Sequence, residues 1–133
     1  MLIYKITLRG ILSFGPDTPP LSMQPLNVLI GPNGSGKSNL IAAIDFMRSS
    51  PNQLSKPIRD GGGTRAWVWK GGHIVRAVVE LLLDGDTAKA MIFRNSTDNL
   101  RHRIEFYCSL DSQFLLGDEI VAELNADTTK SAS

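Results

Sequence analysis

Residues 26–41 read LNVLIGPNGSGKSNLI, and this stretch decides the fold. Within it, residues 31–38 match the pattern G-x-x-x-x-G-K-[ST] at every fixed position. The uncharged run at residues 26–30, before the pattern, predicts a strand that is buried on both faces. Apolar residues at helical spacing follow the pattern and predict an amphipathic helix over residues 37–48. The sequence therefore predicts a strand, a phosphate-binding loop and a helix in succession.

The residue types in this loop suit the binding of a triphosphate. Glycines let the backbone approach a small anion without a clash from a Cβ atom, and the N–H groups of Gly34 and Gly36 to Ser38 would form a nest for it. The following helix adds the positive end of its dipole. Lys37 would contact the β- and γ-phosphates, and the hydroxyl of Ser38 would coordinate Mg²⁺. A glycine-rich turn with a solvated lysine is the alternative. The predicted nucleotide-binding residues are Gly31, Pro32, Asn33, Gly34, Ser35, Gly36, Lys37, Ser38 and Asn39.

Composition limits the other classes of protein. The chain has 133 residues, a net charge of +1 and 42% hydrophobic residues, which indicates one globular domain. Its apolar runs are too short for a transmembrane helix, so we expect no membrane partner. A single cysteine, Cys108, indicates a reducing compartment, and we expect a cytoplasmic protein. Residues 1–66 carry seven basic and three acidic residues, against seven and ten in residues 67–133. The positive half is therefore the half that holds the loop.

The rest of the chain predicts mainly strands. Residues 1–9 alternate apolar and polar residues as a strand does. Residues 74–83 and 87–94 flank Asp84-Gly85-Asp86, which is a hairpin signal. Residues 101–110 alternate as a strand, and residues 114–124 suit a strand or a short helix. We expect one domain portion over residues 1–124, with the phosphate loop and first helix in 26–50, a mobile loop in 51–65 and a β-rich lobe in 66–124, and then a polar tail in 125–133.

Residues 26–41 resemble the phosphate-loop region of ABC-type ATPases in the SMC, RecF and bacterial predicted AAA-family group. That group shows GPNGSGKS, then Asn or Thr, then an aliphatic helix. Residues 6–14 resemble its opening strand and N-F-[KR]-S-F element, with Leu12 in place of the basic residue. Residues 58–63 and 67–71 resemble one subgroup. The resemblance implies an α/β fold of the P-loop NTPase type, with a mixed sheet and an antiparallel β lobe.

Two further motifs of this group have no convincing counterpart here. Walker B needs an apolar run that ends in Asp and usually Glu. The run that ends at Asp84 is interrupted by Glu80 and followed by Gly85, so a hairpin turn is favoured. Residues 114–119 end in Asp-Glu, but Gly117 stands where a buried strand needs an apolar side chain, which favours a turn. No LSGG-like signature is present. We therefore expect the N-terminal portion of a longer ATPase.

The resemblance implies that the chain binds ATP and Mg²⁺. It implies hydrolysis only if a second ATPase module, in a homodimer or a completing chain, supplies the missing half. DNA is a further partner that the family implies. Three alternatives stay open, namely a non-enzymatic nucleotide-binding module, a DNA-associated module, and a truncated remnant without function. No carboxylate in this sequence is predicted to be catalytic.

Several isolated residues favour structural roles. Cys108 and His102 share the apolar face of a strand, and His73 has no second ligand at metal spacing. Trp67 and Trp69 are predicted to lie on one face of a strand. They favour a packing cluster over base stacking with Arg65 and Lys70. A basic residue near the N-terminus, Lys5 or Arg9, is a further candidate for contact with the nucleotide.

Overall fold

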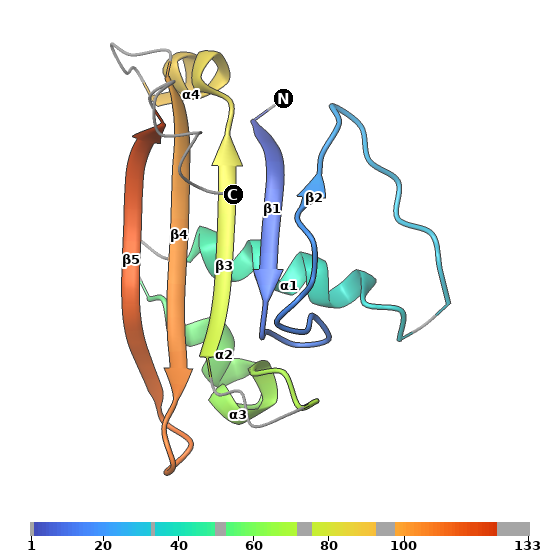
Figure 1. The fold of residues 1–133 in the computed structure, drawn as a ribbon, viewed down its shortest axis with the longest axis vertical. Helices are drawn as coiled ribbons and strands as arrows, with labels where there is room; N and C mark the ends of the chain where they lie inside the picture. The colour runs from blue at the N-terminus through green and yellow to red at the C-terminus, as the bar shows by residue number, and fades with distance from the viewer. Residues whose placement is uncertain (1, 33, 50–52, 72–75, 93–97, 125–133) are drawn as a thin grey trace.

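A computed structural model of the chain describes residues 2–32, 34–49, 53–71, 76–92 and 98–124. In these residues, five strands form one sheet in the order β2-β1-β3-β4-β5, and each pairing is antiparallel (Figure 1). The strands are β1 (Ile3–Arg9), β2 (Leu21–Ser22), β3 (Arg76–Leu83), β4 (Asn99–Cys108) and β5 (Phe114–Leu124). The helices are α1 (Lys37–Arg48), α2 (Lys56–Asp60), α3 (Thr64–Trp67) and α4 (Gly85–Ile92).

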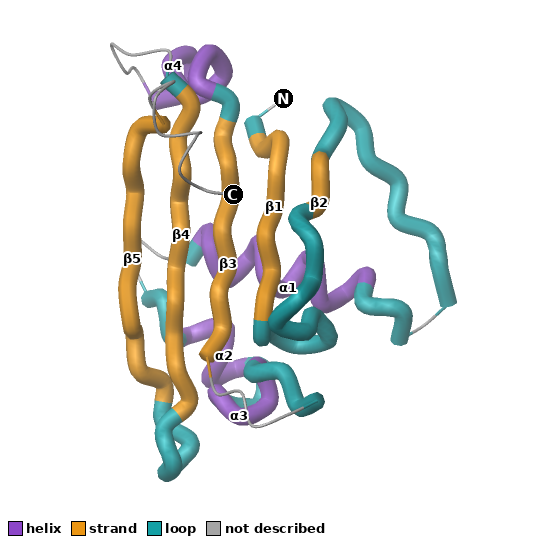
Figure 2. The backbone as a smooth tube through the Cα atoms, in the orientation of Figure 1, coloured by secondary structure: helices purple, strands orange, loops and turns teal. Residues whose placement is uncertain are grey.

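The core lies between one face of the sheet and the helices α1 to α3. In Figures 1 and 2, α1 and α2 run behind the sheet, and α3 lies beyond the lower end of β3. Phe46 of α1 is fully buried at its centre, with its ring centroid 6.0 Å from that of Trp67 and 5.3 Å from that of Phe106. Alternation along β1 sends Ile6 and Leu8 into this core. The other face of the sheet has no covering helix among the described residues. The helix that follows the glycine loop is thereby fixed against β1, β3 and β4.

The prediction of a buried strand over residues 26–30 is wrong. This segment pairs with no strand among the described residues, and Figure 1 shows it running outside the sheet after β2. Leu26 is 81% exposed, Val28 72% and Ile30 90%. A parallel strand needs a neighbour to accept and donate its backbone hydrogen bonds, and none of the described segments supplies one. The apolar run is therefore present without the partner that its composition requires.

The prediction of a hairpin around Asp84 is correct for the strand before it and wrong for the strand after it. After β3 the chain forms α4 instead of a returning strand. The carboxylate of Asp84 accepts hydrogen bonds from the backbone N–H of Thr87 at 3.3 Å and from its hydroxyl at 2.6 Å. These bonds keep the pKa of Asp84 below its ordinary value. Asp84 is therefore a helix cap in place of a turn residue.

The segment 51–65, predicted as a mobile loop, contains α2 and the start of α3 in its described part. Ile58 anchors α2 in the core with 1% of its surface exposed. Trp67 ends a helix and is not on a strand face with Trp69, but its burial against Phe46 confirms that it packs in the core. The helices were missed because each is only four or five residues long.

The segment Phe114–Leu124 is a strand throughout, at the edge of the sheet. Its pairing with β4 shifts between Asp118 and Leu116, which makes Gly117 the extra residue of a bulge. A Cβ atom on Gly117 would lie 2.3 Å from the Tyr107 ring, so glycine is required there. Asp118 and Glu119 stand within an exposed antiparallel strand, neither at the end of a buried one nor in the predicted turn.

The predictions for the isolated cysteine and histidine residues have different outcomes. Cys108 is buried as predicted, and His102 lies on the same face of β4 as Cys108, half-buried, with its ring nitrogen 3.1 Å from Glu119. His73 lies outside the described residues. Among the described helices, none combines the length and the apolar character needed to cross a bilayer.

Candidate functional site

The glycine loop owes its shape to two residues with positive φ. Gly34 has φ of 85° and Gly36 has φ of 99°, both in the region that side-chain-bearing residues rarely adopt. Between them, the N–H of Ser35 donates to the carbonyl of Pro32 at 3.2 Å and closes a turn. Asn33, the remaining predicted site residue of the turn, lies outside the described residues. The loop therefore curls back before α1 begins.

Helix α1 begins at Lys37 without a side-chain cap. Gly36 is its N-cap, and Leu40 makes the first helical bond by donating to the Gly36 carbonyl at 3.0 Å. An N-cap Ser or Asp would satisfy one N–H of the first turn with its side chain, whereas glycine leaves these groups available. The first turn also carries no acidic residue that would oppose an anion. The start of α1 therefore presents N–H groups and a positive dipole end in an arrangement suited to a phosphate.

The side chain of Lys37 turns back over the loop. Its ammonium donates to the carbonyl oxygen of Gly31 and approaches that of Pro32 at 3.4 Å. A Cβ on Gly31 would lie 2.8 Å from the hydroxyl oxygen of Ser35, so the loop is closely packed at this point. The ammonium of Lys37 therefore lies over the same loop that precedes the free N–H groups of α1.

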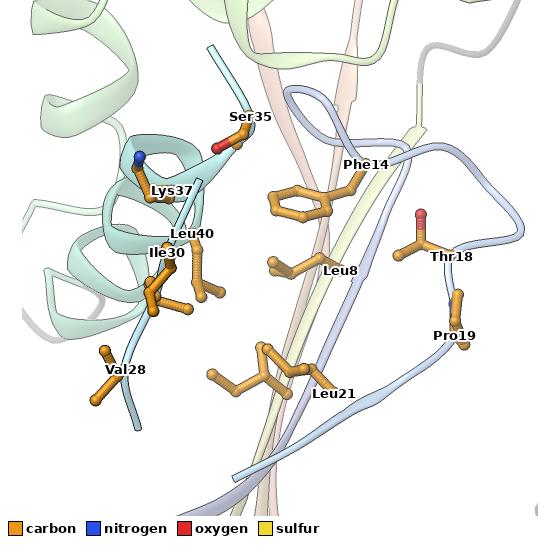
Figure 3. A pocket seen from close by; sticks show the side chains of 13 residues that line it. Leu8, Phe14, Thr18, Pro19, Leu21, Val28, Ile30, Ser35, Lys37 and Leu40 are labelled. Carbon is orange, nitrogen blue, oxygen red and sulfur yellow. The ribbon is translucent and has the colours of Figure 1, made fainter. Parts of the chain in front are cut away.

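A cavity of about 350 Å³ opens beside the loop (Figure 3). Ser35, Gly36 and Lys37 of the loop, together with Thr18, supply its polar part. Figure 3 shows Phe14, Leu8 and Leu21 facing Ile30 and Val28 across it. Sequence reasoning missed the contribution of residues 14–21 to this cavity, for which the only signal was the element around Phe14. The full lining is Ile6, Leu8, Phe14, Thr18, Pro19, Leu21, Val28, Leu29, Ile30, Ser35, Gly36, Lys37 and Leu40.

The other predicted site residues lie around the cavity without lining it. Ser38 is exposed in the first turn of α1. The side-chain amide of Asn39 donates to the hydroxyl of Ser13 at 2.9 Å. Pro32 contributes a carbonyl, as described for Lys37. The structure thus gathers the loop residues at one end of the cavity.

The described lining of the cavity contains no catalytic carboxylate. None of the described residues that line it is acidic, and no group of three metal-ligating side chains occurs in the described part of the chain. Glu119, the best Walker B candidate by sequence, contacts His102 on the far strands of the sheet. Arg9 is not among the residues that line this cavity: its Nε donates to the carbonyl of Thr18 at 3.3 Å, and its side chain lines a separate cavity.

The loop, the four helices and the strands β3 and β4 lie within a match to a known protein family. The family described as "AAA domain, putative AbiEii toxin, Type IV TA system" matches residues 26–113. The chain belongs to this family of AAA domains. The match begins at the unpaired segment 26–30, so this segment is part of the region that the family shares despite its exposure here.

Curated relatives are SMC proteins. The chain is 32% identical over 97 residues to "Structural maintenance of chromosomes protein 3" of Caenorhabditis elegans, which covers 72% of this chain and 8% of that protein. It is 32% identical over 97 residues to "Chromosome partition protein Smc" of Desulfitobacterium hafniense, which covers 73% of this chain and 7% of that protein. The chain therefore spans less than a tenth of the length of these two relatives.

A solved structure confirms the fold. A structure described as "Structural biochemistry of ATP-driven dimerization and DNA stimulated activation of SMC ATPases" superposes with a TM-score of 0.67 at 22% identity. The superposition covers 90% of this chain and 72% of that one. The predicted α/β fold of the P-loop, SMC-like type is therefore correct, although each strand pairing described here is antiparallel.

Proposed function

We propose that this AAA domain binds Mg-ATP at the loop formed by residues 31–38. The observation that carries the proposal is the uncapped start of α1 behind two left-handed glycines, with the ammonium of Lys37 folded over the same loop. Free N–H groups and an ammonium are the donors that a triphosphate requires. Ser38, one residue further along, would supply its hydroxyl to the Mg²⁺ that neutralises the phosphates. Similarity to SMC ATPases favours ATP among the nucleotides.

Hydrolysis is proposed to require a second ATPase module. The described cavity lining holds no carboxylate that could orient a water molecule, and positioning of water is most of what such catalysis needs. The exposed apolar run 26–30 also needs a neighbouring strand. We infer that a second copy or a completing chain pairs with this run and supplies the catalytic carboxylate. The similar SMC structure is described as one of ATP-driven dimerization, which supports an assembly of this kind.

We place this activity in the cytoplasm, in line with the single buried thiol of Cys108.

Calorimetric titration of the full chain with Mg-ATP tests the binding proposal. Saturable binding is expected for the native chain, and Lys37→Ala should weaken it by about a hundredfold or more because the phosphates lose their cation. Lys70→Ala is the matched control, since Lys70 is exposed and distant from the loop in sequence. Equal affinity in the native chain and in Lys37→Ala would reject the site. Phosphate release that rises only after a partner chain is added would support the second module.

Association with DNA is a second candidate, favoured by the uncovered face of the sheet. A cavity of about 520 Å³ on that face is lined by Arg9, Arg76 and Arg103, of which Arg76 pairs with Glu105, and Arg103 pairs with both Glu105 and Glu80. Glu105 accepts two hydrogen bonds from Arg76 at 2.7 and 2.6 Å, and these lower its pKa to about 2. The similar SMC ATPases are described as activated by DNA, which supports the choice of polyanion.

Fluorescence anisotropy with a labelled duplex separates this second candidate from the first. Arginine contacts to phosphates predict an affinity that falls steeply with salt and does not require ATP. Arg9→Ala combined with Arg76→Ala should weaken binding and flatten the salt dependence. Arg48→Ala combined with Lys70→Ala serves as control, because it also removes two positive charges from exposed side chains. An equal loss of DNA affinity in the control variant would mean that net charge alone determines binding, and it would reject a site on the sheet.

A further inference from the structure

A contact from a distant part of the chain reaches the start of α1. The side-chain amide of Asn39 donates to the hydroxyl oxygen of Ser13 at 2.9 Å, across 26 positions of sequence. The same oxygen lies 3.2 Å from the place that a Cβ on Gly36 would occupy. Ser13 therefore stands against both the N-cap residue and the first turn of the helix, without lining the cavity beside the loop.

The turn that carries Ser13 is held in an unusual conformation. Gly10 has φ of 67°, and Leu12 has φ of 52°, which is rare for a residue with a branched side chain. The N–H of Leu12 donates to the carbonyl of Trp67 at 2.6 Å, and the N–H of Trp69 donates to that of Gly10 at 2.9 Å. The end of α3 and the residues after it thus clamp the turn and fix where Ser13 points.

The start of α1 needs support that leaves its N–H groups free. A capping side chain would fix the helix end by accepting a hydrogen bond from one of these groups, and the cap here is glycine. The bond between Asn39 and Ser13 joins two side chains and uses no backbone N–H of the first turn. It can therefore hold the end of the helix in place while the N–H groups remain available to an anion.

We propose that Ser13 is a positioning residue of the phosphate site. Through Asn39, it fixes the first turn of α1 against the clamped turn 10–14 and so keeps the loop in the shape that binds phosphate. The inference rests on the proposed function, because it concerns the same loop. It differs from that proposal in naming a residue outside the loop and outside the cavity.

Two single variants, Ser13→Ala and Asn39→Ala, and their combination test the proposal in the full chain. Each single variant should weaken Mg-ATP binding about three- to tenfold, and the combination should weaken it no further, because both remove one bond. Ser13→Thr keeps the hydroxyl and should stay within about twofold of the native affinity. Without nucleotide, amide exchange at residues 38–40 should be faster in the single variants than in the native chain. A general loss of stability would instead speed exchange in the strands of the sheet as well.

Ser22→Ala, on the exposed strand β2, is the matched control and should change neither readout. Native affinity in both single variants, or additive losses in the combination, would overturn the positioning role. In that case Lys37→Ala would still abolish binding and the proposed function would stand. If the native chain and Lys37→Ala bound ATP equally weakly, the proposed function would fail, and amide exchange would still decide whether Ser13 holds α1. Should Ser13→Ala fail to fold, Asn39→Ala on the surface of α1 gives the same test.

Discussion

The ammonium of Lys37 donates a hydrogen bond to the carbonyl oxygen of Gly31, six residues earlier in the same loop. The carbonyl of Pro32 lies 3.4 Å from the same nitrogen. Loop carbonyls therefore hold the cation that the proposed function assigns to the phosphates. A phosphate oxygen would have to compete with Gly31 for this group, and it would win through its negative charge.

This relationship predicts different effects for two changes at position 37. Lys37→Gln retains a donor that can reach the Gly31 carbonyl, whereas Lys37→Ala does not. Both should lose most of the affinity for Mg-ATP, because neither carries a charge. Only Lys37→Ala should change the melting temperature of the nucleotide-free chain, and by no more than a few degrees. Calorimetry and thermal melting of the two variants check this, and strong ATP binding by Lys37→Gln would contradict the role of the charge.

The glycines of the loop are expected to differ in their tolerance of alanine. Gly36→Ala places a Cβ on a residue with φ of 99° and against Ser13, and should cost about 1–2 kcal/mol of stability together with most of the ATP affinity. Gly31→Ala meets mainly the hydroxyl of Ser35, which can rotate away, so its effect should be smaller. Melting and titration of the two variants provide the comparison. A larger loss in Gly31→Ala would show that packing, and not the backbone conformation, limits the loop.

The loop was predictable from the sequence because its conformation is local. Gly34 and Gly36 allow the required backbone angles, and the amphipathic pattern after them fixes α1, so the motif specified both the turn and the helix. Ser13 was not predicted to matter, because its link to Asn39 spans 26 positions and depends on the fold of the turn that carries it. Local pattern carries no information about such a contact.

Two errors of prediction have different physical causes. The run 26–30 has the composition of a buried strand, but burial requires a neighbouring strand that the described residues do not contain. The sequence Asp84-Gly85-Asp86 suits a turn as well as a helix start. A helix starts here because the N–H and the hydroxyl of Thr87 both donate hydrogen bonds to the carboxylate of Asp84. The composition therefore indicated that 26–30 is apolar and that 84–86 suits a chain reversal or a helix start. It did not indicate which other residues each segment contacts.

The exposed run before the loop predicts self-association of the chain. Val28 and Ile30 are 72% and 90% exposed next to Leu26, and a contiguous apolar surface of this kind favours contact with another copy. Val28→Ser combined with Ile30→Ser should weaken association about tenfold and leave the melting temperature unchanged, since neither side chain lies in the core. Leu110→Ser, at a position that is 98% exposed in a turn, is the control. Sedimentation over a range of concentrations measures this, and equal association in the two variants would reject an interface at the run.

The charged network on the sheet predicts a dependence of stability on pH. Glu105 is held ionised mainly by Arg76, with further hydrogen bonds from Tyr107 and Arg103, and its pKa falls from 4.5 to about 2. Because the folded pKa is lower than the unfolded one, this contribution is present above pH 4.5 and is lost as the pH falls toward 2. After allowance for solvent screening, Glu105→Gln should lower the free energy of unfolding by about 1–2 kcal/mol at pH 7 and by progressively less between pH 4 and 2. Asp111→Asn, at an exposed position in the turn after β4, should show no such convergence. Denaturant unfolding at several pH values tests this, and a constant difference between the native chain and Glu105→Gln across that range would mean that packing of the side chain, not its charge, stabilises the sheet.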